Sequence, residues 1–214
     1  MAQRTVHYVF GQLLAERCGL EDAPRFLFGT LLPDAVSKEE RDTSHYALVS
    51  PENLRCYDFV RFRREFAARI PADPLCLGYY MHLVEDSFYR FFFRREYDYY
   101  FTTPEAMNAL YRDYHLLNPR LRDRYALVNR LALPADWADE PLRRIAHFDA
   151  EGLLRDFAED LREEPEGAFD TMTPEIIERF LDKYLPLAEK ELRAVLRGET
   201  LLRPQDFAWE KKQK

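Results

Sequence analysis

Residues 73–100, DPLCLGYYMHLVEDSFYRFFFRREYDYY, decide the fold. Asp73 followed by Pro74 is typical of a helix start, because an aspartate side chain can accept backbone N–H bonds and proline fits the first turn. No further proline interrupts the segment, so we expect one long helix that runs to about Tyr100. Its phenylalanines recur around the helix, which favours packing in a core over a membrane-interface surface.

Apolar residues return at helical spacing along most of the remaining chain. We expect a first helix that ends near Cys18-Gly19, and others over 22–32, 57–70, 103–117 and 173–197, with a short one beginning at Pro119. Residues 33–56 form a long polar stretch without strand alternation and are expected to be a loop, a kind of segment that is often functional. The sequence therefore predicts an all-α, single-domain bundle over 1–214, with no strand.

Composition restricts the function. The chain has 214 residues, 47% of them hydrophobic, and a net charge of −7 from 31 Lys+Arg and 38 Asp+Glu. This acidic balance argues against a stable nucleic-acid complex, which needs clustered positive charge. Three cysteines without C-x-x-C spacing are expected to be free buried thiols. No apolar stretch is long enough to span a membrane and no secretion signal is evident, so we expect a cytoplasmic protein.

His82 and Asp86 are the most informative pair of polar residues. They lie four residues apart within GYYMHLVEDSFYR, so both side chains share one helix face with Leu75 and Tyr79 and point inward. A buried carboxylate is costly unless it is paired or binds a metal. The pair is therefore either a hydrogen bond inside the core or half of a metal site.

Three further residues bear on the choice between a core hydrogen bond and a metal site. His7 lies beside the apolar stripe of the first helix, Asp34 follows Pro33 in LFGTLLPD, and His45 follows Thr43-Ser44 in the polar stretch. Taken singly, they are compatible with a core histidine, a turn aspartate and a surface histidine. Taken together with the pair, histidine and aspartate side chains form a suitable ligand set for Zn²⁺.

At this point the chain resembles a known family, the zinc-dependent phospholipases C together with the single-strand-specific nucleases that share their all-helical fold. The resemblance is carried, in order over about residues 5–118, by TVHYVFGQLLAE, FLFGTLLPDA, SHY and GYYMHLVEDSFYR. It is closest to a cytoplasmic bacterial branch that carries a stretch like RDYHLLNPRL. The resemblance implies that residues 5–118 supply the site and that 119–214 are supporting helices.

The resemblance also implies a ligand set and an activity. The implied zinc ligands, for one to three ions, are His7, Asp34, His45, His82 and Asp86, with Asp86 bridging two ions. The implied reaction is hydrolysis of a phosphodiester or phospholipid by metal-activated water, with Asp34 as ligand or general base. Arg90, one turn beyond Asp86, is placed either to reach a substrate phosphate or to form a surface salt bridge.

The pattern departs from the family where a third metal is expected. The order of ligands fits His115, followed by His147 and Glu151, but the spacings differ, and Asp113 lies beside His115 in the stretch DYHLLN. Asp113 and His115 are retained as candidate ligands. His147 and Glu151 are either ligands or solvent-exposed residues near the start of a helix. A different enzyme class, the helical phosphohydrolases with adjacent His-Asp, is discounted because none of the five histidines is directly followed by an aspartate. The non-enzymatic alternative is a helical protein with a structural metal site.

Overall fold

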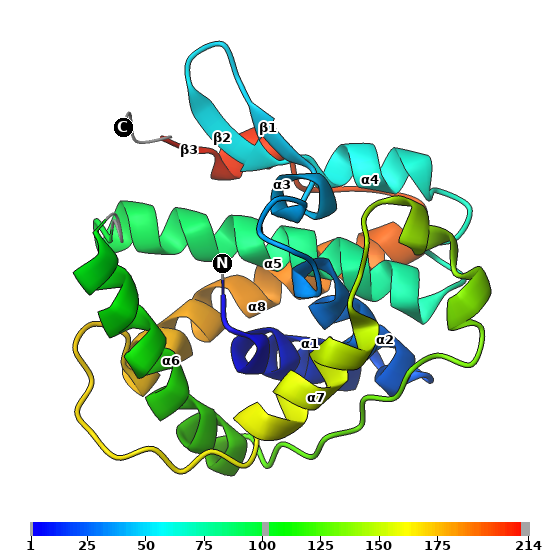
Figure 1. Cartoon of the computed structure of the whole chain (residues 1–214). Helices are drawn as coiled ribbons and strands as arrows, with labels where there is room; N and C mark the ends of the chain where they lie inside the picture. The colour runs from blue at the N-terminus through cyan, green and yellow to red at the C-terminus, as the bar shows by residue number, and fades with distance from the viewer. Residues whose placement is uncertain (1, 100–102, 211–214) are drawn as a thin grey trace.

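Helices form most of the computed structural model, which describes residues 2–99 and 103–210 (Figure 1). The longer helices are α1 (Arg4–Cys18), α2 (Ala23–Leu31), α5 (Pro74–Glu96), α6 (Pro104–Arg124), α7 (Ala150–Asp160) and α8 (Pro174–Leu196). Short helices α3 (Arg41–Ser44) and α4 (Phe59–Glu65) and several single 3₁₀ turns, including Leu32–Asp34, lie between them. The predominance of helix expected from the sequence is confirmed.

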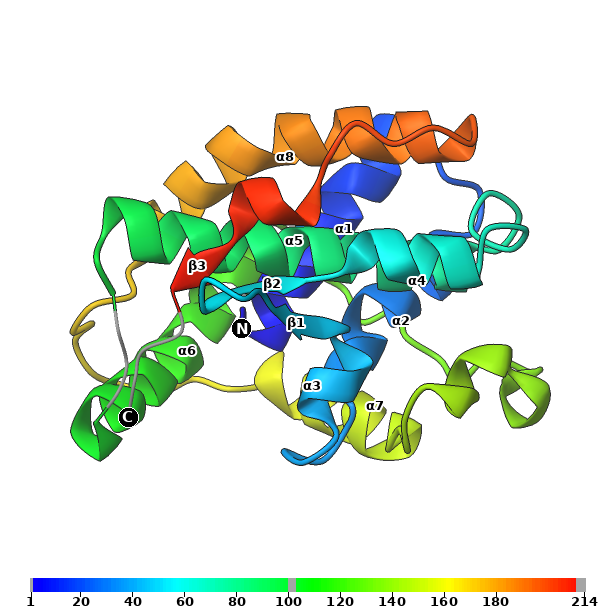
Figure 2. The same cartoon turned by 90° about the horizontal axis from the view of Figure 1, so that it is seen from above.

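Helix α5 runs through the middle of the molecule and packs against α1, α2, α4 and α8 (Figures 1 and 2). It begins as predicted, with the Asp73 carboxylate accepting a hydrogen bond from the Leu75 N–H at 3.0 Å. It ends at Glu96, and the expected last residue, Tyr100, lies outside the described residues. Phe88, Phe92 and Phe93 are buried, so the prediction that the aromatic run packs in the core is confirmed.

Two glycines let α2 and α5 approach closely. A Cβ added to Gly78 on α5 would lie 2.1 Å from the Phe26 carbonyl oxygen, and one added to Gly29 on α2 would lie 2.2 Å from the Leu75 carbonyl oxygen. Real Cβ atoms do not come so near to backbone, so this crossing requires glycine on both helices. The crossing brings the end of α2, and with it Asp34, up to the middle of α5.

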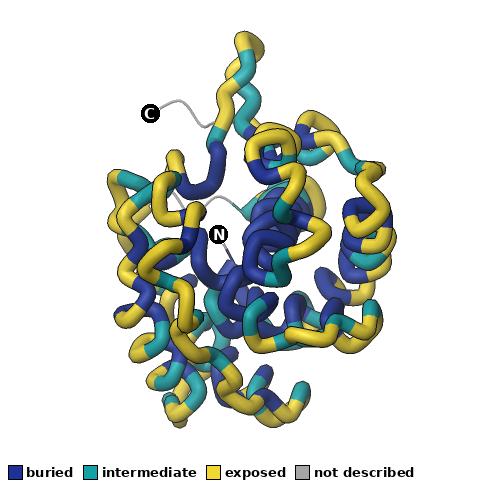
Figure 3. Tube along the Cα trace, turned by 90° about the vertical axis from the view of Figure 1, so that its right-hand side faces the viewer, coloured by how far each residue is buried: buried dark blue, intermediate teal, exposed yellow. Residues whose placement is uncertain are grey.

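The expectation that the chain contains no strand is wrong. Strands β1 (Ala47–Val49), β2 (Leu54–Tyr57) and β3 (Trp209–Glu210) form an antiparallel sheet in the order β1-β2-β3. The β1–β2 hairpin projects from the helices and ends in exposed residues (Figures 1 and 3). Its strands are too short for polar–apolar alternation to be recognised, and β3 pairs with β2 across 150 residues of sequence.

Two local predictions are also corrected. Pro119 lies inside α6 and starts no new helix. A proline in a helix interior removes one hydrogen bond, but burial of the adjacent Leu117, Asn118 and Leu121 holds the helix together across it. The polar stretch 33–56 is likewise ordered, because it contains α3 and the hairpin.

One cluster of buried apolar residues joins α1, α2, α5 and α8 and takes in residues from α6 and α7. Figure 3 shows buried residues gathered in the interior, with exposed ones on the outer turns. Among the residues that the structure describes, no helix combines the length and apolar character needed to cross a membrane.

Candidate metal centre

Five polar residues predicted from the sequence lie together at the centre of the fold. His7 comes from α1, Asp34 from the turn after α2, His45 from the residue after α3, and His82 and Asp86 from α5. All three imidazoles and the Asp86 carboxylate are buried, while the Asp34 side chain keeps 9% exposure. We call these five residues the His–Asp cluster.

Each histidine of the cluster is held through Nδ1. His82 Nδ1 lies 2.8 Å from the Thr30 carbonyl oxygen, and His45 Nδ1 lies 2.9 Å from the Arg41 carbonyl oxygen. Because a carbonyl oxygen can only accept, both Nδ1 atoms donate to it, and in the neutral form of each ring Nε2 is the nitrogen that can bind a metal. His7 Nδ1 lies 2.8 Å from a carboxylate oxygen of Glu85. This arrangement of outer partners is the usual one around metal-binding histidines.

The carboxylate oxygens of the cluster face the Nε2 atoms of its histidines. Asp34 turns one oxygen to His7 Nε2 at 3.5 Å and the other to His45 Nε2 at 3.3 Å. Asp86 does the same, at 3.7 Å from His7 Nε2 and 3.5 Å from His45 Nε2. His82 Nε2 lies 3.1 Å from His45 Nε2. Both carboxylates therefore span the gap between His7 and His45.

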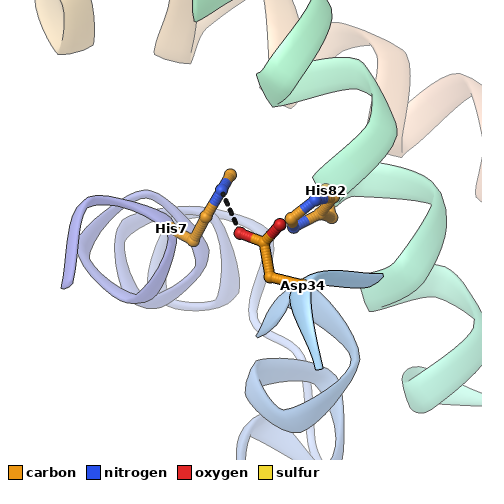
Figure 4. Close-up of side chains that lie close together, drawn as sticks. All are labelled: His7, Asp34 and His82. Atoms are coloured by element: carbon orange, nitrogen blue, oxygen red, sulfur yellow. Dashed lines mark ion pairs between the residues drawn. The ribbon is translucent and has the colours of Figure 1, made fainter. Parts of the chain in front are cut away.

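These separations fit a tetrahedral metal. Zinc bonds of about 2.0–2.1 Å at tetrahedral angles place neighbouring ligand atoms roughly 3.3 Å apart. The facing atoms of the His–Asp cluster are separated by 3.1 to 3.7 Å. Figure 4 shows one corner of the cluster, with His7, Asp34 and His82 converging from α1, the turn after α2 and α5.

Several of these atoms also lack a partner. His7 Nε2, Asp34 Oδ1 and Asp86 Oδ2 are buried, and none has a hydrogen-bond partner among residues 2–99 and 103–210. A buried polar atom without a hydrogen-bond partner is costly, and a cation bound within the cluster would supply the missing interactions. Within the described residues, two overlapping groups satisfy the spacing for a metal site: His7 with Asp34 and His82, and His45 with His82 and Asp86.

The surroundings shift the pKa values of His7 and His82 in opposite directions. Burial alone would lower the pKa of His7, but Glu85 and the other carboxylates around it raise that pKa to about 10. Burial, together with the positive charge of His7, lowers the pKa of His82 to about 3. Burial opposes ionisation of Asp34, yet the imidazoles hold its pKa well below the ordinary value. In the protein without metal, His7 therefore carries a proton that a metal must displace.

Two pockets reach the cluster through Asp34. One, of about 690 Å³, is lined by Arg4, Trp137 and Phe148 among others. The second, of about 460 Å³, is lined by Arg4, Arg41, Arg90 and Arg94, and Ala2 also borders it. The Ala2 N–H donates a hydrogen bond to Asp86 Oδ1 at 3.0 Å, so the start of the chain also lies against the cluster.

The other candidate ligands lie apart from the cluster. Asp113 is buried and accepts hydrogen bonds from the backbone N–H groups of 170–172 at 2.7 to 2.9 Å, which fixes the segment before α8. His115 is exposed and pairs with Glu163. His147 and Glu151 are exposed on the wall of the larger pocket. The structure thus gives Asp113 a structural role and brings none of the four to the five clustered residues.

Sequence reasoning missed the groups that support the cluster. Glu85 faces His7 although it neighbours Asp86 in the chain, and the carbonyl of Thr30 carries no sequence signal at all. Arg41 was unremarkable in a polar stretch, and its side chain enters the smaller pocket only because α3 folds back. Of these, only Glu85 could have been suspected, as a second acidic residue on a helix with an inward-facing pair.

Comparisons were made with protein-family models, with curated proteins and with solved structures. None of the three produced a match to the chain. The interpretation of the site therefore depends on its own geometry.

Proposed function

We propose that this protein is a zinc-dependent hydrolase of phosphate esters, with a fold of the phospholipase C and zinc nuclease type. The observation that carries the proposal is the pair of carboxylates, Asp34 and Asp86, that each turn one oxygen to His7 and the other to His45. Two carboxylates that bridge two histidines form a ligand set for a pair of metal ions.

The residues divide between two ions. His7 and Asp34 would hold one ion and His45 and Asp86 the other, and His82 lies within reach of both positions. When bound, such a pair lowers the pKa of a coordinated water and stabilises the charge that develops on the phosphoryl oxygens. A ligand set of histidines and carboxylates suits zinc, whereas magnesium and calcium prefer sites made of oxygen ligands alone.

Asp34 is the ligand closest to solvent. It alone of the cluster lines both pockets, so a phosphate ester that enters either pocket meets its carboxylate first. Both of its oxygens face imidazole nitrogens, at 3.5 Å from His7 Nε2 and 3.3 Å from His45 Nε2, so neither is directed at a water in the pockets. We assign it as a ligand at the substrate side and not as a general base.

Hydrolysis of a bis-aryl phosphate tests the proposal. Zinc-loaded wild type should release the aryl alcohol, and treatment with a chelator should abolish the release. Asp34→Asn keeps the shape of the side chain but removes its charge, and should lower turnover by about 100-fold or more. Asp123→Asn, at an exposed position on α6, is the matched control and should retain full activity. Zinc-loaded wild type that hydrolyses neither bis-aryl phosphate nor phospholipid would overturn the proposal.

The second candidate is a structural metal site without catalysis. It is favoured by the burial of His7, His45, His82 and Asp86, which leaves only Asp34 in contact with solvent. The two functions predict different results for the same preparation. Bound zinc that raises the melting temperature without any turnover supports the structural role, whereas zinc-dependent turnover supports the hydrolase.

A further inference from the structure

The smaller of the two pockets beside the cluster gathers positive charge. Four arginines, Arg4, Arg41, Arg90 and Arg94, line it, against the carboxylates of Asp34 and Asp160. Asp160 already pairs with Arg4 at 2.7 Å, and Asp34 belongs to the cluster. The chain as a whole carries a net charge of −7, so this concentration of arginine is a local feature. We call it the arginine pocket.

The arginine pocket is continuous with the metal centre along α5. His82, Asp86, Arg90 and Arg94 follow one another at intervals of four residues, and such residues form a single ridge on a helix. Each step advances roughly 6 Å along the axis. The Cα atoms of Arg90 and Arg94 therefore lie roughly 6 and 12 Å along the axis beyond that of Asp86. Both side chains line the pocket that Ala2 and Asp34 also border.

Donors in the arginine pocket are left unsatisfied. The Nε atoms of Arg41 and Arg90 are buried, and neither has a hydrogen-bond partner in the part of the chain that the structure describes. Arg41 comes from α3 and Arg90 from α5, so they approach the pocket from different elements. A buried guanidinium N–H that lacks an acceptor is costly, and an anion placed between the two elements would satisfy both.

The chemistry of the donors selects the anion. A guanidinium presents a planar fork of N–H donors that matches the oxygens of phosphate, and several arginines together favour a doubly charged group. Apolar and aromatic side chains, Met107, Leu110 and Tyr111, form the other wall. A phosphate attached to an organic skeleton fits this combination of donors and apolar surface.

We propose that the arginine pocket binds a second phosphate group of the substrate. The substrate is then a phosphate ester that carries another phosphoryl group beside the one that is hydrolysed. This proposal rests on the hydrolase function for its substrate, but the binding of phosphate in the pocket does not depend on metal.

Phosphate binding tests the pocket directly. The probe is inorganic phosphate, titrated by calorimetry into full-length protein that has been stripped of metal with a chelator and dialysed. Arg41→Met keeps the apolar stem, and since its guanidinium Nε has no partner, folding should not suffer. We expect it to weaken phosphate binding at least 10-fold, while Arg64→Met, at an exposed position on α4, leaves binding unchanged. Equal affinity in wild type and Arg41→Met, or no binding in either, would overturn the proposal.

Kinetics separate this proposal from the hydrolase function. Two diesters are compared with zinc-loaded protein: a bis-aryl phosphate, and the same diester bearing a phosphate on one ring. The increase in KM caused by Arg41→Met should be at least 10-fold larger for the phosphorylated diester, with little change in kcat. An equal increase for both diesters would contradict a phosphate subsite. If wild type hydrolyses neither diester while phosphate still binds through Arg41, the proposed hydrolase function is contradicted and the proposed phosphate binding in the pocket is supported.

Discussion

At the scale of the residue, the hydrogen bonds at Nδ1 determine what the three histidines of the cluster can do. Two carbonyl oxygens and one carboxylate orient the rings so that the Nε2 atoms of His7 and His45 each face both aspartates, while His82 Nε2 faces His45 Nε2. The inward direction of His82 and Asp86 could be predicted, because a spacing of four residues on an apolar helix face requires it. The partners of the rings could not, since backbone carbonyls have no signature in a sequence.

Zinc affinity should rise with pH above neutrality. Glu85 and the other carboxylates outweigh burial and hold the pKa of His7 at about 10, so at pH 7 zinc must displace a proton from His7. We expect affinity to increase by about tenfold per pH unit between pH 7 and 9, measured against a competing chelator of known protonation. In Glu85→Gln the pKa of His7 falls and the slope should become shallower. A constant wild-type affinity over this range would contradict the assignment of His7 as a ligand.

Asp113 should matter for stability and not for metal. Its carboxylate accepts three backbone N–H bonds from 170–172, so Asp113→Ala leaves these donors unpaired and should lower the free energy of unfolding by about 2–4 kcal/mol. Asp170→Ala, in the same segment, removes only an exposed pair with Arg112 and should cost less than about 1 kcal/mol. Urea denaturation measures both. Loss of zinc from Asp113→Ala while the fold remains intact would return Asp113 to the ligand set.

At the scale of the element, helix starts could be predicted and the short strands could not. Aspartate or threonine before proline marks the starts of α5, α6 and α8, since the fixed backbone and missing N–H of proline are local effects. The side chain also caps α5 and α6, but not α8. The sheet depends on β3 pairing with β2 from the far end of the chain. The close crossing of α2 and α5 is likewise tertiary, since no sequence pattern pairs Gly29 with Gly78.

Replacing Gly78 with alanine should destabilise the protein. The added methyl group meets the Phe26 carbonyl oxygen at 2.1 Å, and backbone cannot move aside without separating α2 from α5. We expect a loss of about 1–3 kcal/mol in the free energy of unfolding, in spite of the higher helix propensity of alanine. Gly11→Ala is the control, because its neighbours are side chains at 3.0–3.1 Å that can shift. A Gly78→Ala protein as stable as wild type would show that the crossing tolerates separation.

Removal of metal should loosen the segment that carries Asp34 and His45. Residues 33–46 contribute two of the five clustered side chains but contain only one helical turn, α3, and a 3₁₀ turn. We expect amide hydrogen exchange in 33–46 to accelerate when zinc is removed, while the centre of α5 stays protected. The β1–β2 hairpin, which holds itself by its own ladder, serves as the internal reference. Identical exchange with and without metal would exclude His45 as a ligand.

At the scale of the whole molecule, the fold brings four separate segments to one buried point that borders two pockets. Residues 2–86 supply all five clustered side chains, and α6, α7 and α8 pack around them. The sequence predicted the clustered residues through their resemblance to a motif order. It could not predict that Asp113 and His115 lie outside the cluster, because their positions depend on where α6 lies. The arginine pocket could not be predicted, because Arg4, Arg41 and Arg90 meet only after α1, α3 and α5 have assembled.

The zinc content of the purified protein tests the central claim most directly. Wild type, purified without chelator and analysed for metal per chain, should contain two zinc ions, because Asp34 and Asp86 each bridge the positions of His7 and His45. Asp86→Ala removes a carboxylate that faces both His7 and His45 and should retain one zinc ion or fewer, while exposed Asp123→Asn retains two. Wild type without bound zinc, or Asp86→Ala with as much zinc as wild type, would contradict the account.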